Sequence, residues 1–240
     1  MRTFVVLNDI QIPLQDKQVL GLVLKFVKDL RPDGVILNGD VADCYPISKY
    51  MHDPKYPYTL KDEVEQCHKL MTQLENVNEK YYLGGNHEDR LRKYIWNNAP
   101  ALGLDDRLDF SKYFGLSDHG FKWKPWGGRV DLGRLIVTHG FSVRMHSGYS
   151  AKAHFERLGS SVLIGHTHRL GSHFKTDTHG THAAYENGCL CSFDMGYVQY
   201  PNWQQGFSVV HVDTGGWFQV TQIPILGHKR FYFGKNKWEI

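Results

Sequence analysis

Several features that would place a protein in the membrane, secreted or disulfide-rich classes are missing from this chain of 240 residues. No apolar run approaches the roughly 18 residues that a membrane-spanning helix needs. The first apolar run, residues 4–7, soon meets Asp9, so we predict neither a membrane span nor a signal peptide. The four cysteines form no CxxC pair, which is typical of reduced thiols. The sequence therefore predicts a cytoplasmic protein without a membrane partner.

The chain also lacks a strong charge imbalance. Its formal net charge is +3, and its lysines and arginines form no stripe interleaved with aromatic residues. This balance permits anionic substrates, and it permits nucleic acid as a partner without indicating it. Repeats and low-complexity linkers are absent too, so residues 1–240 are predicted to form a single domain. With 41% hydrophobic and 22% charged residues, a chain of this length can bury roughly 70–75% of its unfolded surface.

The first half of the chain alternates between strand-like apolar runs and helix-like apolar spacing. Short apolar runs at residues 4–8, 35–37 and 81–83 predict buried strands. Helical spacing follows Asp16 after the first run and a capping box that begins at Thr59 after the second. This order of strands and helices favours parallel strands joined by right-handed crossovers.

The second half changes character. Short buried strands are predicted at residues 135–137 and 162–164, and after residue 170 the pattern becomes strands joined by turns, at residues 173–185, 206–213 and 217–224. That change favours a second, more antiparallel sheet. The predicted fold class is α/β, with two sheets packed face to face as a sandwich and flanked by α-helices.

Five of the predicted strands run directly into a polar residue beside glycine or within a turn. Ligands of open α/β sheets bind beyond the carboxyl ends of the strands, so we expect these side chains to gather at one place. Glycine at such turns lets the backbone bend sharply and lets a ligand approach closely. The residues are Asp9, Asp40, Asn86 with His87, His139, and His166 with His168.

This set of residue types predicts a centre for divalent metal ions. Aspartate, asparagine and histidine supply mixed oxygen and nitrogen ligands, which suit Mn, Fe, Zn or Ni better than Mg or Ca alone. Two such ions bring four positive charges, of which Asp9 and Asp40 neutralise two, so positive charge remains for a phosphate. A metal pair can also convert water into hydroxide near neutral pH. His87 directly follows Asn86, so it points elsewhere and suits a general acid for the departing oxygen.

The five blocks, in this order, resemble those of the calcineurin-like metallophosphoesterases. Two later segments, residues 186–191 and 202–207, resemble those of phage and prophage members of that family. The resemblance implies a sandwich of two mixed sheets flanked by helices, and hydrolysis of a phosphoester by in-line attack on phosphorus. The five blocks are DIQ at 9–11, GDVAD at 39–43, GNHE at 85–88, THG at 138–140 and GHTH at 165–168.

The resemblance also implies a role for each residue of the blocks. Asp9 and His168 would hold the first metal, and Asp40 would bridge to the second. His87 would protonate the leaving group while Asp43 orients and charges it, since a nearby carboxylate favours imidazolium. Two divalent ions are implied as cofactors, with manganese favoured and Fe, Zn, Ni or Mg also suited. The second metal would be held by Asn86, His139 and His166.

One block departs from the family pattern. Gln11 stands where the family has the histidine of Asp-x-His. Both side chains are neutral, but an amide oxygen is a harder ligand than an imidazole nitrogen. If Gln11 binds, we expect a first site with a weaker preference for Zn and more tolerance for Mn or Mg. If it does not bind, Gln11 is a plain wall residue.

The residues leave the class of substrate open. The substrate is a phosphomonoester or a phosphodiester, the latter including a nuclease substrate, and a non-catalytic metal-binding scaffold of the same fold is the rival to an enzyme. Glu88 and Arg90 are predicted to form an ion pair at a helix start. Cys189 and Cys191 alternate in a strand-like run and are predicted to be buried thiols on one face.

Overall fold

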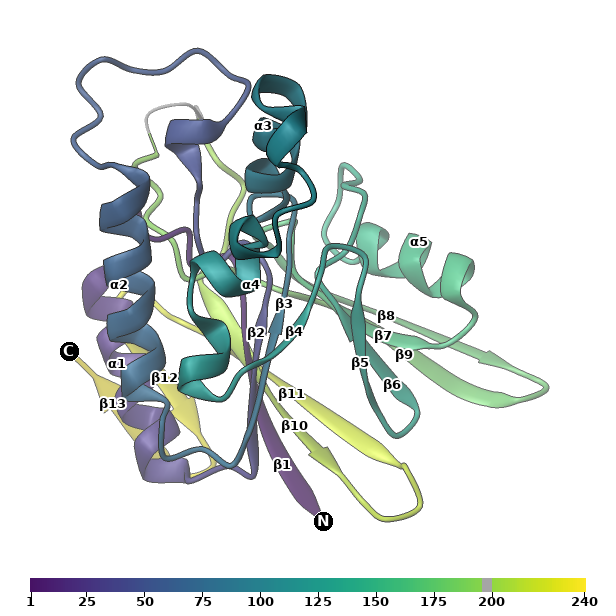
Figure 1. The fold of residues 1–240 in the computed structure, drawn as a ribbon. Coiled ribbons are helices and arrows are strands. Elements are labelled where there is room, and N and C mark those ends of the chain that lie inside the picture. Colours follow the sequence, from purple (N-terminus) through teal and green to yellow (C-terminus); the bar gives the residue numbers. More distant parts are fainter. Residues whose placement is uncertain (196–199) are drawn as a thin grey trace.

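Residues 1–195 and 200–240 are described by the structure, a computed structural model. Its larger sheet has six strands (Figure 1). They are β1 (Arg2–Leu7), β2 (Gly34–Asn38), β3 (Glu79–Leu83), β4 (Lys122–Lys124), β10 (Gly206–Val212) and β11 (Phe218–Pro224). Their order is β11-β10-β1-β2-β3-β4. Strands β1 to β4 run parallel, whereas β10 is antiparallel to β1, and β11 is antiparallel to β10.

The second sheet has five strands and is also mixed. They are β5 (Arg129–Leu132), β6 (Leu135–Thr138), β7 (Ser161–Ile164), β8 (Leu170–Asp177) and β9 (Gly180–Asn187). Their order is β5-β6-β7-β9-β8. The central three run parallel, and β5 and β8 are antiparallel edges.

One part of the predicted sheet assignment is wrong. The strands near residues 206–213 and 217–224 do not extend the second sheet but join the first, where β10 pairs with β1 and opposes Phe4 with Val210. The physical reason is burial on both faces. Phe207 and Val209 face one apolar cluster while Val210 and Val212 face another, so β10 needs a place inside the sandwich rather than at an edge.

Helices flank the two sheets on their outer faces (Figure 1). The Asp16 carboxylate caps α1 by accepting from two backbone N–H groups, and Thr59 with Asp62 forms the predicted capping box of α2. The α-helices are α1 (Lys17–Leu30), α2 (Leu60–Gln73), α3 (Asp89–Asn98), α4 (Phe110–Tyr113) and α5 (Tyr149–Leu158). Short 3-10 turns lie at Tyr45–Ile47, Pro100–Leu102, Asp106–Leu108 and Leu116–His119.

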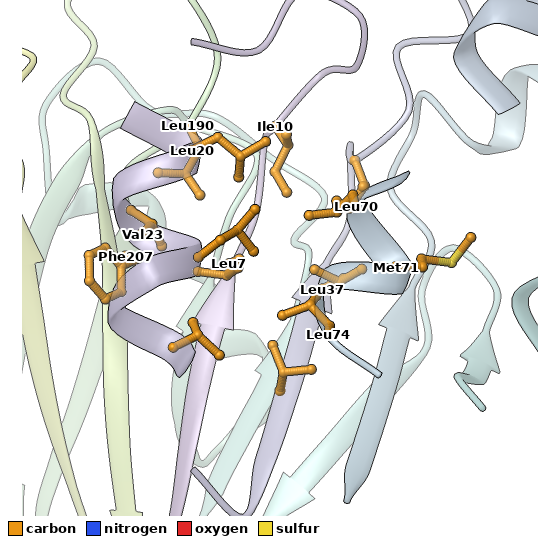
Figure 2. Packing of buried hydrophobic residues seen from close by; sticks show 14 of the residues in the cluster. Leu7, Ile10, Leu20, Val23, Leu37, Leu70, Met71, Leu74, Leu190 and Phe207 are labelled. Atoms are coloured by element: carbon orange, nitrogen blue, oxygen red, sulfur yellow. The ribbon is translucent and has the colours of Figure 1, made fainter. Parts of the chain in front are cut away.

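Apolar side chains of β1 show how the layers are held. Leu7 lies with Val23 of α1 and Met71 of α2 in one cluster of buried residues between helices and sheet (Figure 2). The preceding residue, Val6, points to the other face and packs in a second cluster. That cluster also contains Leu163 of β7, so it lies between the two sheets. Each such buried side chain stabilises the fold by about 1.5–3 kcal/mol. The predicted sandwich of two mixed sheets flanked by helices is confirmed.

The C-terminal segment adds a two-stranded hairpin that the sequence did not predict. It consists of β12 (Arg230–Phe233) and β13 (Asn236–Glu239). Phe231 stacks on Trp238, and both pack against Phe26 of α1 with ring centroids 5.4 and 5.0 Å away. Within the described ranges, no helix has the length and apolar character to cross a bilayer.

Candidate metal centre

The parallel strands of both sheets end at the same edge of the sandwich. β1, β2 and β3 run parallel in one sheet, and β6 and β7 run parallel in the other. Side chains that follow them meet across the two sheets: Asp40 after β2 lies beside His139 after β6. The expected gathering of distant polar residues therefore occurs.

Asp40 is the centre of one group of ligand-competent atoms. One atom each of Asp40, His139 and His166 lie within 4.8 Å of one another. Asp40 Oδ2 lies 3.2 Å from His139 Nε2, and Asp40 Oδ1 accepts a hydrogen bond from the backbone N–H of His87 at 2.9 Å. His139 Nδ1–H donates to the Asn38 carbonyl at 2.8 Å, which fixes the tautomer and turns Nε2 toward the group.

Asp9 and His168 form the neighbouring half of the centre. Asp9 Oδ1 lies 3.2 Å from His168 Nε2, and Asp9 Oδ2 accepts from the backbone N–H of His166 at 2.9 Å. Gln11 Nε2 lies 3.2 Å from the same His168 nitrogen. Gln11 is therefore placed within this half of the centre, where the family resemblance puts the missing histidine.

Three buried atoms at this place indicate that the residues fit a divalent cation. Asp9 Oδ1, Asn86 Oδ1 and His139 Nε2 are buried and make no hydrogen bond within the described residues. A buried polar atom left unsatisfied costs about 1–3 kcal/mol. Carboxylate and amide oxygens and the nitrogen of a deprotonated imidazole are the ligands that a divalent transition metal ion takes, and a bound ion would displace the proton of His139.

The backbone around the centre adopts an uncommon conformation. Asp9, Gln11, Asp40, His166 and His168 all have φ between 49° and 68°, the left-handed region. Non-glycine residues there are strained and cluster at functional sites. Close approach also restricts the neighbouring glycines. A Cβ at Gly39, which has φ +84°, would collide with the ring of His139, and one at Gly85 would collide with the Asp40 carboxylate.

The pKa values of the residues in the Asp40 group are shifted in different directions. Burial by itself would raise the pKa of Asp40, but the imidazoles of His139 and His87 hold it well below its usual value. Burial would lower the pKa of His139, and the Asp40 carboxylate outweighs it, giving about 9. Burial and then the charge of His139 lower the pKa of His166 to about 4. Asp40 is thus a carboxylate and His166 a neutral imidazole, the forms in which each binds a metal.

His87 and Asp43 lie together beside this group. His87 Nδ1–H donates to Asp43 Oδ1 at 2.7 Å, and its Nε2 lies 3.6 Å from Asp40 Oδ2. Burial would lower the pKa of His87, but the carboxylates of Asp40 and Asp43 outweigh burial and raise it. The structure thus brings the two predicted catalytic residues into contact.

The predicted ion pair between Glu88 and Arg90 is wrong, because no ion pair joins them in the part of the chain that the structure describes. The buried Glu88 carboxylate is instead the acceptor for the loops after β2 and β3. Arg90 reaches Asp43 O at 2.7 Å and His87 Nε2 at 3.0 Å. The groups that donate to Glu88 are the N–H of Asp40, Val41, Ala42 and Gly85 and the hydroxyl of Tyr82.

Two cysteines that were not predicted as ligands lie next to His168. Cys189 and Cys191 are buried free thiols, as predicted. Cys191 Sγ lies 3.6 Å from His168 Nδ1, and one atom each of the three residues lie within 4.8 Å of one another. A hydrogen bond with Cys189 is the main cause that lowers the pKa of Cys191, and the contact with His168 adds to it. Together they outweigh burial and bring this pKa to about 6. Their alternation alone gave no signal for this contact with His168.

Comparison with known proteins decides the family. The family model for the calcineurin-like phosphoesterases matches residues 2–212. The chain belongs to this family. Members of the family bind divalent metals, and the cluster of Asp40, His139 and His166 offers a place for one.

Two phage proteins and one solved structure are similar to this family member. The gene 54 protein of Mycobacterium phage D29 is 31% identical over 262 residues, which cover 100% of this chain and 99% of that protein. The gene 54 protein of Mycobacterium phage L5 is 30% identical over 260 residues, with the same coverage. These relatives confirm the predicted similarity to phage members. Vps29 of Chaetomium thermophilum has 11% identity, a TM-score of 0.50 and coverage of 100% and 99%, which shows the shared fold.

Proposed function

We propose that the chain is a metal-dependent phosphoester hydrolase with a centre for two divalent ions. The observation that carries this proposal is the buried cluster of ligand atoms from Asp40, His139 and His166, with the Asp9–His168 pair beside it, at one edge of the sandwich. The pairing of His87 with Asp43 next to them adds a proton donor.

The residues divide into two ligand groups that share Asp40. Asp9 and His168, with Gln11 beside them, would hold the first ion. Asp40 would contact both ions. Manganese is the favoured metal, since the ligands are mixed oxygen and nitrogen with a harder first site. Asn86, His139 and His166 would complete the second site.

Two divalent ions at this centre would supply positive charge for the phosphoryl group and would activate water for in-line attack on phosphorus. The chain's own residues would then act on the leaving group. His87 Nε2 would donate a proton to the ester oxygen that departs, while Asp43 keeps the other ring nitrogen protonated and fixes the ring. Asp40 would orient His87 through its backbone N–H.

Metal analysis paired with turnover tests this proposal. We expect purified protein to hold two divalent ions per chain and to hydrolyse nitrophenyl phosphate or bis-nitrophenyl phosphate with Mn, Ni, Zn or Mg. His139→Ala should lower both metal content and turnover. One ion or none, together with no turnover under any of the four metals, would instead identify a scaffold. A steep fall of activity with salt on oligonucleotides would identify a nuclease among the diesterases.

A further inference from the structure

A buried polar network that the proposed mechanism does not use lies behind Asp9. Asn8 directly follows β1, Asn187 is the last residue of β9 in the second sheet, and Ser208 lies in β10 of the first sheet. All three residues are fully buried. A buried polar group destabilises the fold unless it is hydrogen-bonded, so the partners of these three side chains show what the network does.

The hydrogen bonds of this network run in one direction, toward Asp9. The Ser208 hydroxyl donates to Asn187 Oδ1, and Asn187 Nδ2–H donates to Asn8 Oδ1. Asn8 Nδ2–H then donates to Asp9 Oδ2. Residues from both sheets are therefore connected to one carboxylate of the candidate metal centre.

Two backbone carbonyls fix the orientation of the amides. A carbonyl oxygen only accepts, so the nitrogen of each amide must face it. Asn187 Nδ2–H donates to the Val6 carbonyl at 3.0 Å, and Asn8 Nδ2–H donates to the Gly188 carbonyl at 2.7 Å. An Asn8 amide turned the other way would place its oxygen against both this carbonyl and the Asp9 carboxylate. The bond from Asn187 to Asn8 Oδ1 also opposes that turn.

At Asp9, these donors determine which oxygen is left for a cation. Oδ2 accepts from Asn8 Nδ2–H and from the backbone N–H of His166 at 2.9 Å. Oδ1 makes no hydrogen bond within the described residues and lies 3.2 Å from His168 Nε2. A Cβ at Gly165 would lie 2.8 Å from Asp9 Oδ2 and 2.9 Å from Asn8 Nδ2, so a side chain there would push these groups apart. The carboxylate is thus held with Oδ1 beside the other proposed ligand of the first ion.

We infer that Asn187 is a positioning residue for the first ion, because it holds Asn8, which in turn orients the Asp9 carboxylate. This inference rests on the proposed function, since it concerns the ion that Asp9 and His168 would bind. Groups that orient metal ligands in this way typically change metal affinity by about 10- to 100-fold. Segment 186–191, which resembles phage members of the family, thereby contributes to the centre through Asn187 without supplying a ligand.

Binding of Mn²⁺ to the full chain, measured by isothermal titration calorimetry after chelation, tests the inference without reference to turnover. His168→Ala and His139→Ala assign the binding steps to the first and the second ion. We expect Asn187→Ala to weaken binding of the first ion about 10- to 100-fold and to leave the affinity for the second ion unchanged. Asn8→Ala should show the same selective loss.

A double variant tests whether Asn187 acts through Asn8. If it does, Asn8→Ala combined with Asn187→Ala should weaken binding of the first ion no more than Asn8→Ala alone. Losses that add would show that Asn187 affects the ion by a different route, and would overturn the inference.

A milder variant and a matched control complete the design. Ser208→Ala removes only the last donor of the network and should weaken the first ion about 2- to 10-fold. It carries the test if thermal melting shows that Asn187→Ala does not fold. Ser161→Ala is the control, since this buried hydroxyl accepts from the Ala183 N–H at the opposite end of β7 from His166. It should change neither affinity.

The outcomes separate this inference from the proposed function. An equal loss of both ions in Asn187→Ala, or no loss of either, would overturn the positioning role while leaving a centre for two ions. If the unaltered protein binds no ion that His168→Ala removes, the proposed two-ion centre fails and the inference fails with it. A selective loss of the first ion in Asn187→Ala and Asn8→Ala, with no further loss in the double variant, supports the inference.

Discussion

His87 is held between groups that act on its pKa in opposite directions. Burial lowers the pKa of this imidazole and so does the charge of Arg90, whereas the carboxylates of Asp40 and Asp43 raise it and prevail. A raised pKa favours the imidazolium, which is the form that a general acid needs. The Arg90 guanidinium lies 3.0 Å from His87 Nε2, the nitrogen that would carry this proton.

Replacement of His87 should separate substrates by their leaving groups. We expect His87→Ala to keep its metal content but to lose about 10²–10⁴-fold in rate on alkyl phosphates, and much less on nitrophenyl esters, whose leaving oxygen needs no proton. His179→Ala is a matched control, since this exposed histidine lies in the turn between β8 and β9. Equal losses on good and poor leaving groups would argue against an acid role.

Gln11 provides a second test at the residue scale. Its amide nitrogen lies 3.2 Å from His168 Nε2, so a histidine at this position would reach the same half of the centre. We expect Gln11→His to shift the metal preference of activity toward Zn, because imidazole is a softer ligand than an amide. Activity and bound metal, measured across Mn, Mg, Ni and Zn, check this. An unchanged order of metals would show that Gln11 does not tune the site.

Sequence reasoning found the proposed ligands because each follows a strand end, and chain order alone places them there. It missed the surroundings of those ligands. The contacts of Arg90 with His87 and of Cys191 with His168 depend on side-chain direction after folding, for which helix and strand spacing gave no signal.

At the scale of elements, Glu88 joins the loops that follow β2 and β3. Its carboxylate accepts from the N–H of Asp40, Val41, Ala42 and Gly85 and from the Tyr82 hydroxyl. These loops carry Asp40 and Asn86, so a single buried side chain fixes the distance between proposed ligands of the two strands. Its position at a helix start suggested an ion pair with Arg90, but the side chain is buried and accepts from these groups instead.

Loss of that carboxylate should therefore affect both stability and metal binding. We expect Glu88→Ala to destabilise the protein by at least about 3 kcal/mol, because several buried N–H groups lose their acceptor, and to weaken metal binding. Tyr82→Phe removes only one of the five contacts and should cost about 1 kcal/mol. Urea unfolding with and without Mn checks both variants. A cost below about 1 kcal/mol for Glu88→Ala would contradict this role.

At the scale of the whole molecule, the two sheets are joined by shared apolar packing. Val6 of β1 and Leu163 of β7 lie in one buried cluster, although they belong to different sheets. The C-terminal hairpin lies beyond the residues 2–212 that the family model matches, yet it packs on α1 through Phe231 and Trp238. That residues 1–240 form a single domain stays a prediction, and this packing supports it.

Unfolding experiments check that prediction. We expect one cooperative transition in urea, coincident by tryptophan fluorescence and far-ultraviolet circular dichroism. Trp238→Ala should shift the whole transition by about 2 kcal/mol, since it removes a large side chain that packs on Phe26. Trp217→Ala is the control: this exposed ring contacts Arg134 and should cost less than about 1 kcal/mol. Two separate transitions would indicate separate domains.

The sequence by itself determined the helix starts at Asp16 and Thr59, the buried strands, and the order in which candidate ligands follow them. These features depend on contacts between residues close in the chain. Only the tertiary structure decided that β10 lies beside β1, that Glu88 joins the loops after β2 and β3, and that Arg90 contacts His87. Such contacts depend on how sheets pair and how side chains turn within a packed interior, and local spacing carries no record of either.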